Sequence, residues 1–408
     1  MLAGKTVSQT CLVVVVLLLT RSLAPDHFGI LATALAVQGY VILIGSAGMP
    51  AIVTRELIRR PDNASRIAST YFALAWAIGG MVALTVCIPL ACFDLSTAER
   101  FVLMTCVIAS AFACGNAQPI LDAYQYQAVP AVLTAFADAL MLIGAVLLIV
   151  YQQLTLYTCA LLFFSKWVAL NGCLIAIAGR FTDLRPRHVA AREASVIWKG
   201  ALPILAASIL YSFPNSGGVI IVRWLNGPTE AAAAGLAYQV FQAFAQVCLL
   251  FQQVIRPHVL GPYGQESWFI KKAIAALLVF LSILVSVTIL FTWLTFRFVV
   301  PAHLSDALPP CLLATLAGVF LAFVHFHGAH TVAMHAERYN ASIMLATAAF
   351  FLALSLALVP YYRTLGQIVA LCATQAVCFL MFARVTTRLR ARNHPRGPVI
   401  PSDGATCL

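Results

Sequence analysis

The stretch that decides the fold lies near the start of the chain. Residues 11–29 read CLVVVVLLLTRSLAPDHFG, an apolar run followed by Arg21, Pro25 and Gly29 and then by more apolar sequence. A helix needs about 20 apolar residues to cross a bilayer, and proline and glycine mark the turn between two helices. The stretch therefore predicts two membrane-spanning helices, near 3–23 and 28–50, joined by a short turn.

A cleaved signal peptide is the alternative interpretation of the first segment. Lys5, the apolar run and Ser22-Leu23-Ala24 would be its three parts. We favour a retained helix, because Pro25 would directly follow the cleavage position and because the next helix begins almost at once.

The rest of the 408-residue chain continues this pattern. It is 62% hydrophobic and only 10% charged, whereas a soluble domain is nearer half apolar and a quarter charged. This composition excludes a water-soluble enzyme and favours an all-α integral membrane protein with about 12 transmembrane helices. We expect the ten further spans near 68–92, 101–119, 130–150, 155–178, 201–223, 232–255, 273–296, 308–333, 341–360 and 365–383.

The distribution of positive charge predicts the orientation. The chain has 25 Lys+Arg against 14 Asp+Glu, and most of the excess falls on one set of loops and on the C-terminal segment. The opposite loops and helix ends hold only five arginines, Arg21, Arg100, Arg223, Arg297 and Arg363. Positively charged loops stay in the cytoplasm, so we expect both termini there. The net charge of +11 then needs no nucleic acid as partner.

A weak internal repeat divides the chain. Arg21-Ser-Leu23 and Arg223-Trp-Leu225 are both followed by a proline and then by a glycine that enters the next helix. Arg55 and Arg256 follow at nearly the same spacing. We therefore predict an N-terminal six-helix bundle (1–190), a C-terminal six-helix bundle (191–390) and a disordered basic cytoplasmic tail (391–408). Two such repeats are typical of transporters that rock two bundles around a central site.

Several short motifs in this order resemble a known family. The matching stretches are residues 18–29 (LLTRSLAPDHFG), 47–50 (AGMP) running on to Arg55-Glu56, Leu202-Pro203, 227–238, Ala336-Glu337-Arg338 and 360–366. Over nearly the whole chain they are similar to the Wzx-type polysaccharide flippases of the multidrug/oligosaccharidyl-lipid/polysaccharide exporter superfamily. The sequence departs from the family at Gly217-Gly218, where an acidic residue is common, and at 122–127 (DAYQYQ), where a basic residue is common.

The resemblance implies a function and partners. It implies a bacterial inner-membrane protein that moves an undecaprenyl-pyrophosphate-linked oligosaccharide, such as an O-antigen or exopolysaccharide unit, from the cytoplasmic to the periplasmic leaflet by alternating access. It also implies work beside a polysaccharide polymerase and a chain-length regulator, in contact with membrane lipids. A cation-coupled drug antiporter of the same superfamily is one alternative, and a membrane enzyme of surface-polysaccharide assembly (polymerase, ligase or acyltransferase) is another.

A diphosphate that crosses hydrocarbon needs fixed cations, because an isolated anion there is very costly. Arginine stays charged and grips phosphate with a planar fork of donors. Arg21, Arg55, Arg223 and Arg256 are therefore the candidate substrate-binding residues, paired across the repeat. The alternative is that Arg21 and Arg223 extend to the interface and that Arg55 and Arg256 are ordinary charges of cytoplasmic loops.

Asp138 and Lys166 are the charged residues placed deepest in predicted spans. Charges within the membrane tend to face the bundle interior, to pair and to mark a pathway. At 1.5 Å rise per residue the two lie at depths that differ by only about 6 Å. We expect an intramembrane ion pair, which is either structural or part of ion coupling.

No motif points to a cofactor. His325, His327, His330 and His335 lack the companions of a metal site, and Gly4-Lys5-Thr6 lacks the glycine and the strand of a phosphate-binding loop. We expect neither metal nor nucleotide and no catalytic residue. The energy would then come from an ion gradient (H⁺ or Na⁺) or from the pull of polymerisation.

Overall fold

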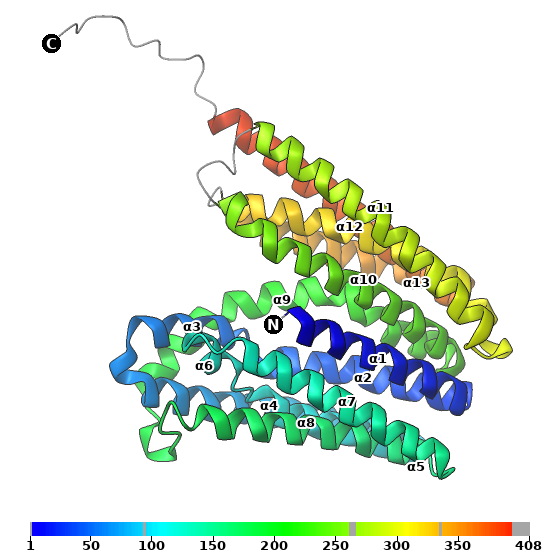
Figure 1. The fold of residues 1–408 in the computed structure, drawn as a ribbon, viewed down its shortest axis with the longest axis horizontal. Helices are drawn as coiled ribbons and strands as arrows, with labels where there is room; N and C mark the ends of the chain where they lie inside the picture. Colours follow the sequence, from blue (N-terminus) through cyan, green and yellow to red (C-terminus); the bar gives the residue numbers. More distant parts are fainter. Residues whose placement is uncertain (1, 93–94, 261–266, 334–336, 394–408) are drawn as a thin grey trace, which may run out of the picture.

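The computed structural model describes residues 2–92, 95–260, 267–333 and 337–393, and all regular elements in these ranges are helices. Eleven of these helices are long and apolar enough to cross a membrane. The axes of these helices are roughly aligned, and consecutive helices run back and forth (Figure 1). The predicted all-α membrane fold is confirmed.

The first half of the chain supplies six long helices. They are α1 (Leu2–Ser22), α2 (Pro25–Ser46), α4 (Ala64–Cys92), α5 (Thr97–Cys114), α7 (Ala128–Val150) and α8 (Leu156–Ala178). Three short elements connect them: α3 (Met49–Arg59), η1 (Pro61–Asn63) and α6 (Gln118–Ala123); a fourth, η2 (Pro186–His188), follows α8. Helix α1 packs on α7 and α2 packs on α5, which also contacts α4 and α8. We call α1–α8 the N-terminal bundle.

The second half forms α9 (Ala191–Asn226), α10 (Pro228–Leu260), α11 (Ser267–Phe298), η3 (Ala302–Ala307), α12 (Leu308–Ala333) and α13 (Glu337–Asn393). Helix α13 contains both of the last two predicted spans. The two spans join at Arg363, where the backbone is non-helical (φ 50°, ψ −130°), shortly after Pro360. All twelve predicted spans therefore fall on helices. We call α9–α13 the C-terminal bundle; the boundary after residue 190 stays a prediction.

The C-terminal tail was predicted to be disordered from residue 391. The last helix continues to Asn393, so residues 391–393 are helical. Residues 394–408 lie outside the described residues.

The two turns of the repeat motif fold as helix–turn–helix units. Ala24 is extended before Pro25 opens α2, and Gly227 (φ 92°) precedes Pro228, which opens α10. Proline suits the first turn of a helix, where its missing N–H has no helical partner. These turns lie at what we call the Arg21 end of the molecule. The opposite end, where α1 begins, is the Lys5 end.

The bundles meet most closely where α2 crosses α10. A Cβ atom added at Gly29 would lie 1.7 Å from the Pro228 carbonyl oxygen, and one added at Gly235 would lie 2.6 Å from the Ala32 Cβ. Small residues let helix backbones approach closely inside membranes. Helix α9 also bridges the bundles, because Ile197 and Ala201 are buried in the same core as residues of α3 and α4. The two bundles are thus in firm contact at the α2–α10 crossing near the Arg21 end and, through the first turns of α9, toward the Lys5 end.

Candidate functional site: a cavity between the bundles

A large cavity opens between α1, α6 and α7 on one side and α10 and α11 on the other. Its main part, the wide compartment, has a volume of about 870 Å³. Lys5, Gln9, Gln118 and Asp122 line it from the N-terminal bundle, and Gln246 lines it from α10. Most of these polar residues belong to the Lys5 end of their helices, so the wide compartment lies toward that end.

A second part, the amide compartment, continues between α1, α2, α8 and α10 with a volume of about 270 Å³. Gln239, Gln242 and Gln246 line it from one face of α10, because residues three and seven positions apart lie on the same side of a helix. Gln9 and Gln38 line it from α1 and α2. Gln9 and Gln246 line both compartments, which are therefore contiguous.

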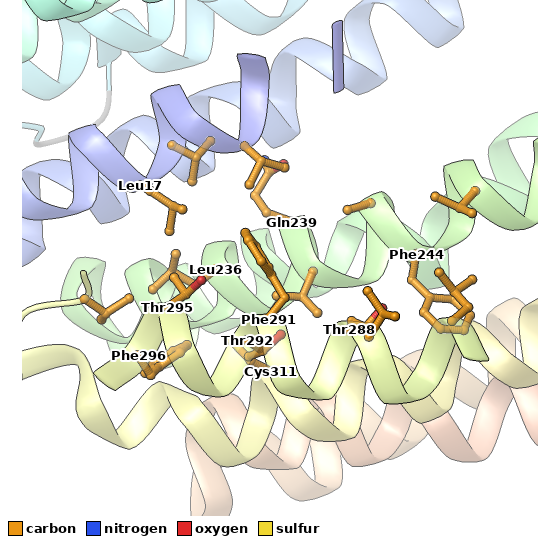
Figure 2. Close-up of a pocket in the computed structure, with 18 residues that line it drawn as sticks. Leu17, Leu236, Gln239, Phe244, Thr288, Phe291, Thr292, Thr295, Phe296 and Cys311 are labelled. Carbon is orange, nitrogen blue, oxygen red and sulfur yellow. The ribbon is translucent and has the colours of Figure 1, made fainter. Parts of the chain in front are cut away.

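The third part is almost purely apolar and has a volume of about 190 Å³. This apolar compartment lies between α1, α10, α11 and α12 (Figure 2). Leu17, Leu236, Phe291 and Phe296 line it, and Gln239 reaches it from α10, as Figure 2 shows. Val13, Phe291 and their neighbours also line the wide compartment, so apolar and polar surfaces adjoin within one cavity.

The predicted intramembrane charges lie together in the N-terminal bundle. Lys166 Nζ lies 2.5 Å from Asp138 Oδ1, and Ser8 donates a 2.5 Å hydrogen bond from its hydroxyl to Asp138 Oδ2. The side chains of Asp138 and Lys166 are 2% and 10% exposed. Lys166 also lines the amide compartment. The network therefore joins α1, α7 and α8 directly beside the cavity.

The candidate arginines lie elsewhere. Arg21 is exposed at the end of α1, and Arg55 is half-exposed on α3, where it pairs with the neighbouring Glu56. Arg223 forms an ion pair with Glu99 of α5. None of these three lines the compartments described above, since each sits near a helix end, beyond the cavity. Arg256 lies on α10, but its side chain is outside the described residues. Their role with substrate stays a prediction.

Two polar contacts join the bundles at the Arg21 end. The Arg223–Glu99 pair links α9 to α5, and Thr229 donates a hydrogen bond to Asp26, which links α10 to α2. Within the C-terminal bundle, Arg363 pairs with Glu230 beside them. Together with the tight crossing at Gly29, these contacts close the Arg21 end between the bundles.

Near the Lys5 end, Arg60 bridges Glu56 and Glu193 at 2.9 Å each. Partial burial lowers the pKa of Arg60, but attraction and hydrogen bonding to Glu193 and Glu56 outweigh it, so the pKa of Arg60 is raised. This cluster fixes the start of α9 to α3. None of its three residues lines the wide compartment.

The histidines of α12 do not form a metal centre within the described part of the chain. No group of three or more His, Cys, Asp or Glu residues is placed to hold a metal there. His325 instead forms a 2.8 Å hydrogen bond with the Tyr211 hydroxyl, and His327 forms one of 3.1 Å with Thr386. The side chains of His330 and His335 lie outside the described residues.

The charged residues and histidines singled out from the sequence do not include the glutamines of the cavity. Gln239, Gln242 and Gln246 recur at helical spacing within an apolar span, and that pattern was a usable signal. Gln38 is a single polar residue in an apolar run, and Gln9 lies in the short polar stretch Ser8-Gln9-Thr10. Nothing in their local sequence predicts that they face α10.

Comparisons with solved structures agree on the fold. A multidrug resistance MATE family transporter of the MOP superfamily, in an inward-facing conformation, is 14% identical with a TM-score of 0.72 over 94% of this chain and 96% of its own. The lipid II flippase MurJ, in an inward closed conformation, is 11% identical with a TM-score of 0.67 over 96% and 88%. An outward-facing MATE family transporter is 12% identical with a TM-score of 0.62 over 95% and 94%.

At the level of sequence, the search of curated proteins finds no significant match. A sequence profile described as "Polysaccharide biosynthesis protein" matches residues 1–259, which is more than half of the chain. This match means that the chain belongs to the polysaccharide biosynthesis protein family.

Proposed function

We propose that this protein flips an undecaprenyl-pyrophosphate-linked oligosaccharide across the bacterial inner membrane by alternating access. The observation that carries the proposal is the cavity, in which a wide polar space adjoins an apolar compartment. A lipid-linked sugar has the same two parts, a hydroxyl-rich head and a hydrocarbon chain. The apolar compartment suits the first part of the polyprenyl chain, and the polar compartments suit the saccharide.

The contacts between the bundles support an inward-open state. The Arg21 end is closed by the Glu99–Arg223 pair and the Gly29 crossing, while the wide compartment lies toward the Lys5 end. The positive loops favour a cytoplasmic position for the Lys5 end. The higher TM-score with the inward-facing MATE transporter than with the outward-facing one agrees. In this state the cavity would load substrate from the cytoplasmic leaflet.

The cation-coupled drug antiporter is the second candidate, since several neighbours in structure are multidrug transporters. Such a protein needs a carboxylate in the membrane that is free to bind a cation. Asp138 is instead held by Lys166 and Ser8, which favours the flippase.

We also propose that the protein works beside a polysaccharide polymerase and a chain-length regulator. Its energy would come from H⁺ or Na⁺ coupling or from the pull of polymerisation. The phosphate-binding role of Arg21, Arg55, Arg223 and Arg256 is part of it. Arg256 follows Gln246 by ten residues on α10, about 15 Å toward the Lys5 end, where a diphosphate would first enter.

A deletion strain tests the proposal. Loss of the gene should lead to a build-up of undecaprenyl-linked repeat units on the cytoplasmic side and to loss of surface polymer, both reversed by the wild-type gene. Normal surface polymer without accumulation would refute the flippase function. Accumulation of a fluorescent cationic drug in the deletion strain would instead favour the antiporter.

A further inference from the structure

The charges that line the wide compartment and the amide compartment balance each other. Among the described lining residues, the charged ones are Lys5, Asp122 and Lys166. Lys166 is neutralised by Asp138 at 2.5 Å. Lys5 and Asp122, which have opposite charges, line the same compartment and interact electrostatically. The described lining therefore offers no arginine and no uncompensated cation to an acidic group on the saccharide. The diphosphate is assigned above to Arg256, whose side chain lies outside the described residues.

Amide side chains take the place of charge. Seven glutamines line the two compartments: Gln9, Gln38, Gln118 and Gln127 come from the N-terminal bundle, and Gln239, Gln242 and Gln246 come from α10. Each amide carries one acceptor oxygen and two N–H donors. The α10 set spans about 10 Å along the helix, so it offers a row of paired donors and acceptors.

One of these amides lacks a partner although it is buried. Gln38 is 4% exposed, lines the amide compartment, and its Nε2 has no hydrogen-bond partner among the described residues. A buried polar group without a partner is costly, and such groups inside membranes mark functional sites. The orphaned donor at the cavity wall therefore points to a ligand that brings its own acceptor.

We infer that the cavity selects a neutral, hydroxyl-rich saccharide and rejects one that carries a carboxylate. This inference rests on the proposed function and names the chemistry of the head group. A sugar hydroxyl both donates and accepts, as an amide does, so each glutamine can bind it without a change of charge. A uronic acid would lose its hydration in a cavity where Asp138 holds Lys166 and Asp122 balances the charge of Lys5, which is costly for a charge.

Two matched lipids test the inference. Undecaprenyl diphosphate carrying a trigalactoside is compared with the same lipid whose terminal galactose is galacturonic acid. The full chain is reconstituted in liposomes, and a membrane-impermeant pyrophosphatase outside releases the saccharide phosphate of each lipid that arrives in the outer leaflet. We expect the neutral lipid to cross at least roughly tenfold faster than the acidic one, as one uncompensated buried charge demands.

Variants at one residue separate binding from folding. Gln246→Leu should slow the neutral lipid by roughly fivefold, the effect of one lost hydrogen-bonding group. Gln246→Arg should raise the acidic-to-neutral rate ratio roughly tenfold, because a guanidinium binds carboxylate well. Gln153 is an exposed glutamine on the α7–α8 connection that lines none of the described compartments. Gln153→Leu and Gln153→Arg serve as controls and should change neither quantity.

The outcomes are distinct. Equal or faster crossing of the acidic lipid by the wild type, or a rate ratio unmoved by Gln246→Arg, overturns the inference while the flippase function stands. If a well-folded wild type moves neither lipid faster than protein-free liposomes do, the proposed function fails and the inference fails with it.

Discussion

At the scale of single residues, the Asp138–Lys166 pair is where stability and function can be separated. The pair is almost fully buried and Ser8 completes it. Removing one partner of a buried pair leaves an uncompensated charge and costs about 3–5 kcal/mol. We expect Lys166→Met to lower the free energy of unfolding of the purified protein by about that amount. The double variant Asp138→Asn/Lys166→Met should recover most of the loss.

The double variant also decides the role of the pair. If the pair is only structural, the recovered protein should transport substrate at the wild-type rate and with the same pH profile. If the pair takes part in ion coupling, transport stays low although the fold is restored. A double variant as unstable as Lys166→Met would show that the charges do not compensate each other.

Arg256 can be tested by its charge and by its shape. We expect Arg256→Ala to abolish complementation of a deletion strain, because a diphosphate needs a cation where it enters the cavity. Arg256→Lys keeps the charge but loses the planar fork of donors, so it should restore surface polymer in part. Equal activity of both variants would show that Arg256 does not bind the phosphate. The measurement is the amount of surface polymer at matched protein levels.

At the scale of helices, the α2–α10 crossing depends on glycine. A Cβ atom at Gly29 would overlap the Pro228 carbonyl, whereas one at Gly39 on the same helix would meet nothing within 4 Å. Gly29→Ala should therefore destabilise the protein by about 1–3 kcal/mol. Gly39→Ala should stabilise it by roughly 0.5–1 kcal/mol, because alanine loses less freedom in a helix. Unfolding of both variants in detergent measures the difference, and a Gly29→Ala variant as stable as wild type contradicts the close crossing.

The helices also show what the sequence predicts and what it does not. Span lengths and charged loops are local properties, so all twelve spans were found, even where α13 joins two of them across Arg363. The partner of a residue at a helix end is not local. Arg223 finds Glu99 from 124 positions away, and nothing in the sequence around Arg223 selects that contact over a phosphate. The same holds for Gln38, whose place in the cavity depends on how α2 meets α10.

At the scale of the whole molecule, the proposed alternating-access mechanism gives the contacts at the Arg21 end a role: they would hold the two bundles in the inward-open state. An inward-open cavity can open outward only if the Glu99–Arg223 pair and the Thr229–Asp26 hydrogen bond separate. A ligand or contact shifts such an equilibrium by its difference in affinity for the two states. The ion pair should therefore set the balance between inward-open and outward-open forms.

A charge exchange tests this role and the competing role of Arg223 as a phosphate ligand. Arg223→Glu places two carboxylates together and should reduce transport strongly, and Glu99→Arg should do the same with two cations. If the pair is a closing contact, the double variant Glu99→Arg/Arg223→Glu restores the attraction and should recover most of the transport measured in reconstituted liposomes. If Arg223 instead binds the diphosphate, the exchange moves the cation from α9 to α5, and transport should stay as low as in Arg223→Glu. The side chains are 23% and 11% exposed, so both variants retain access to water and should fold.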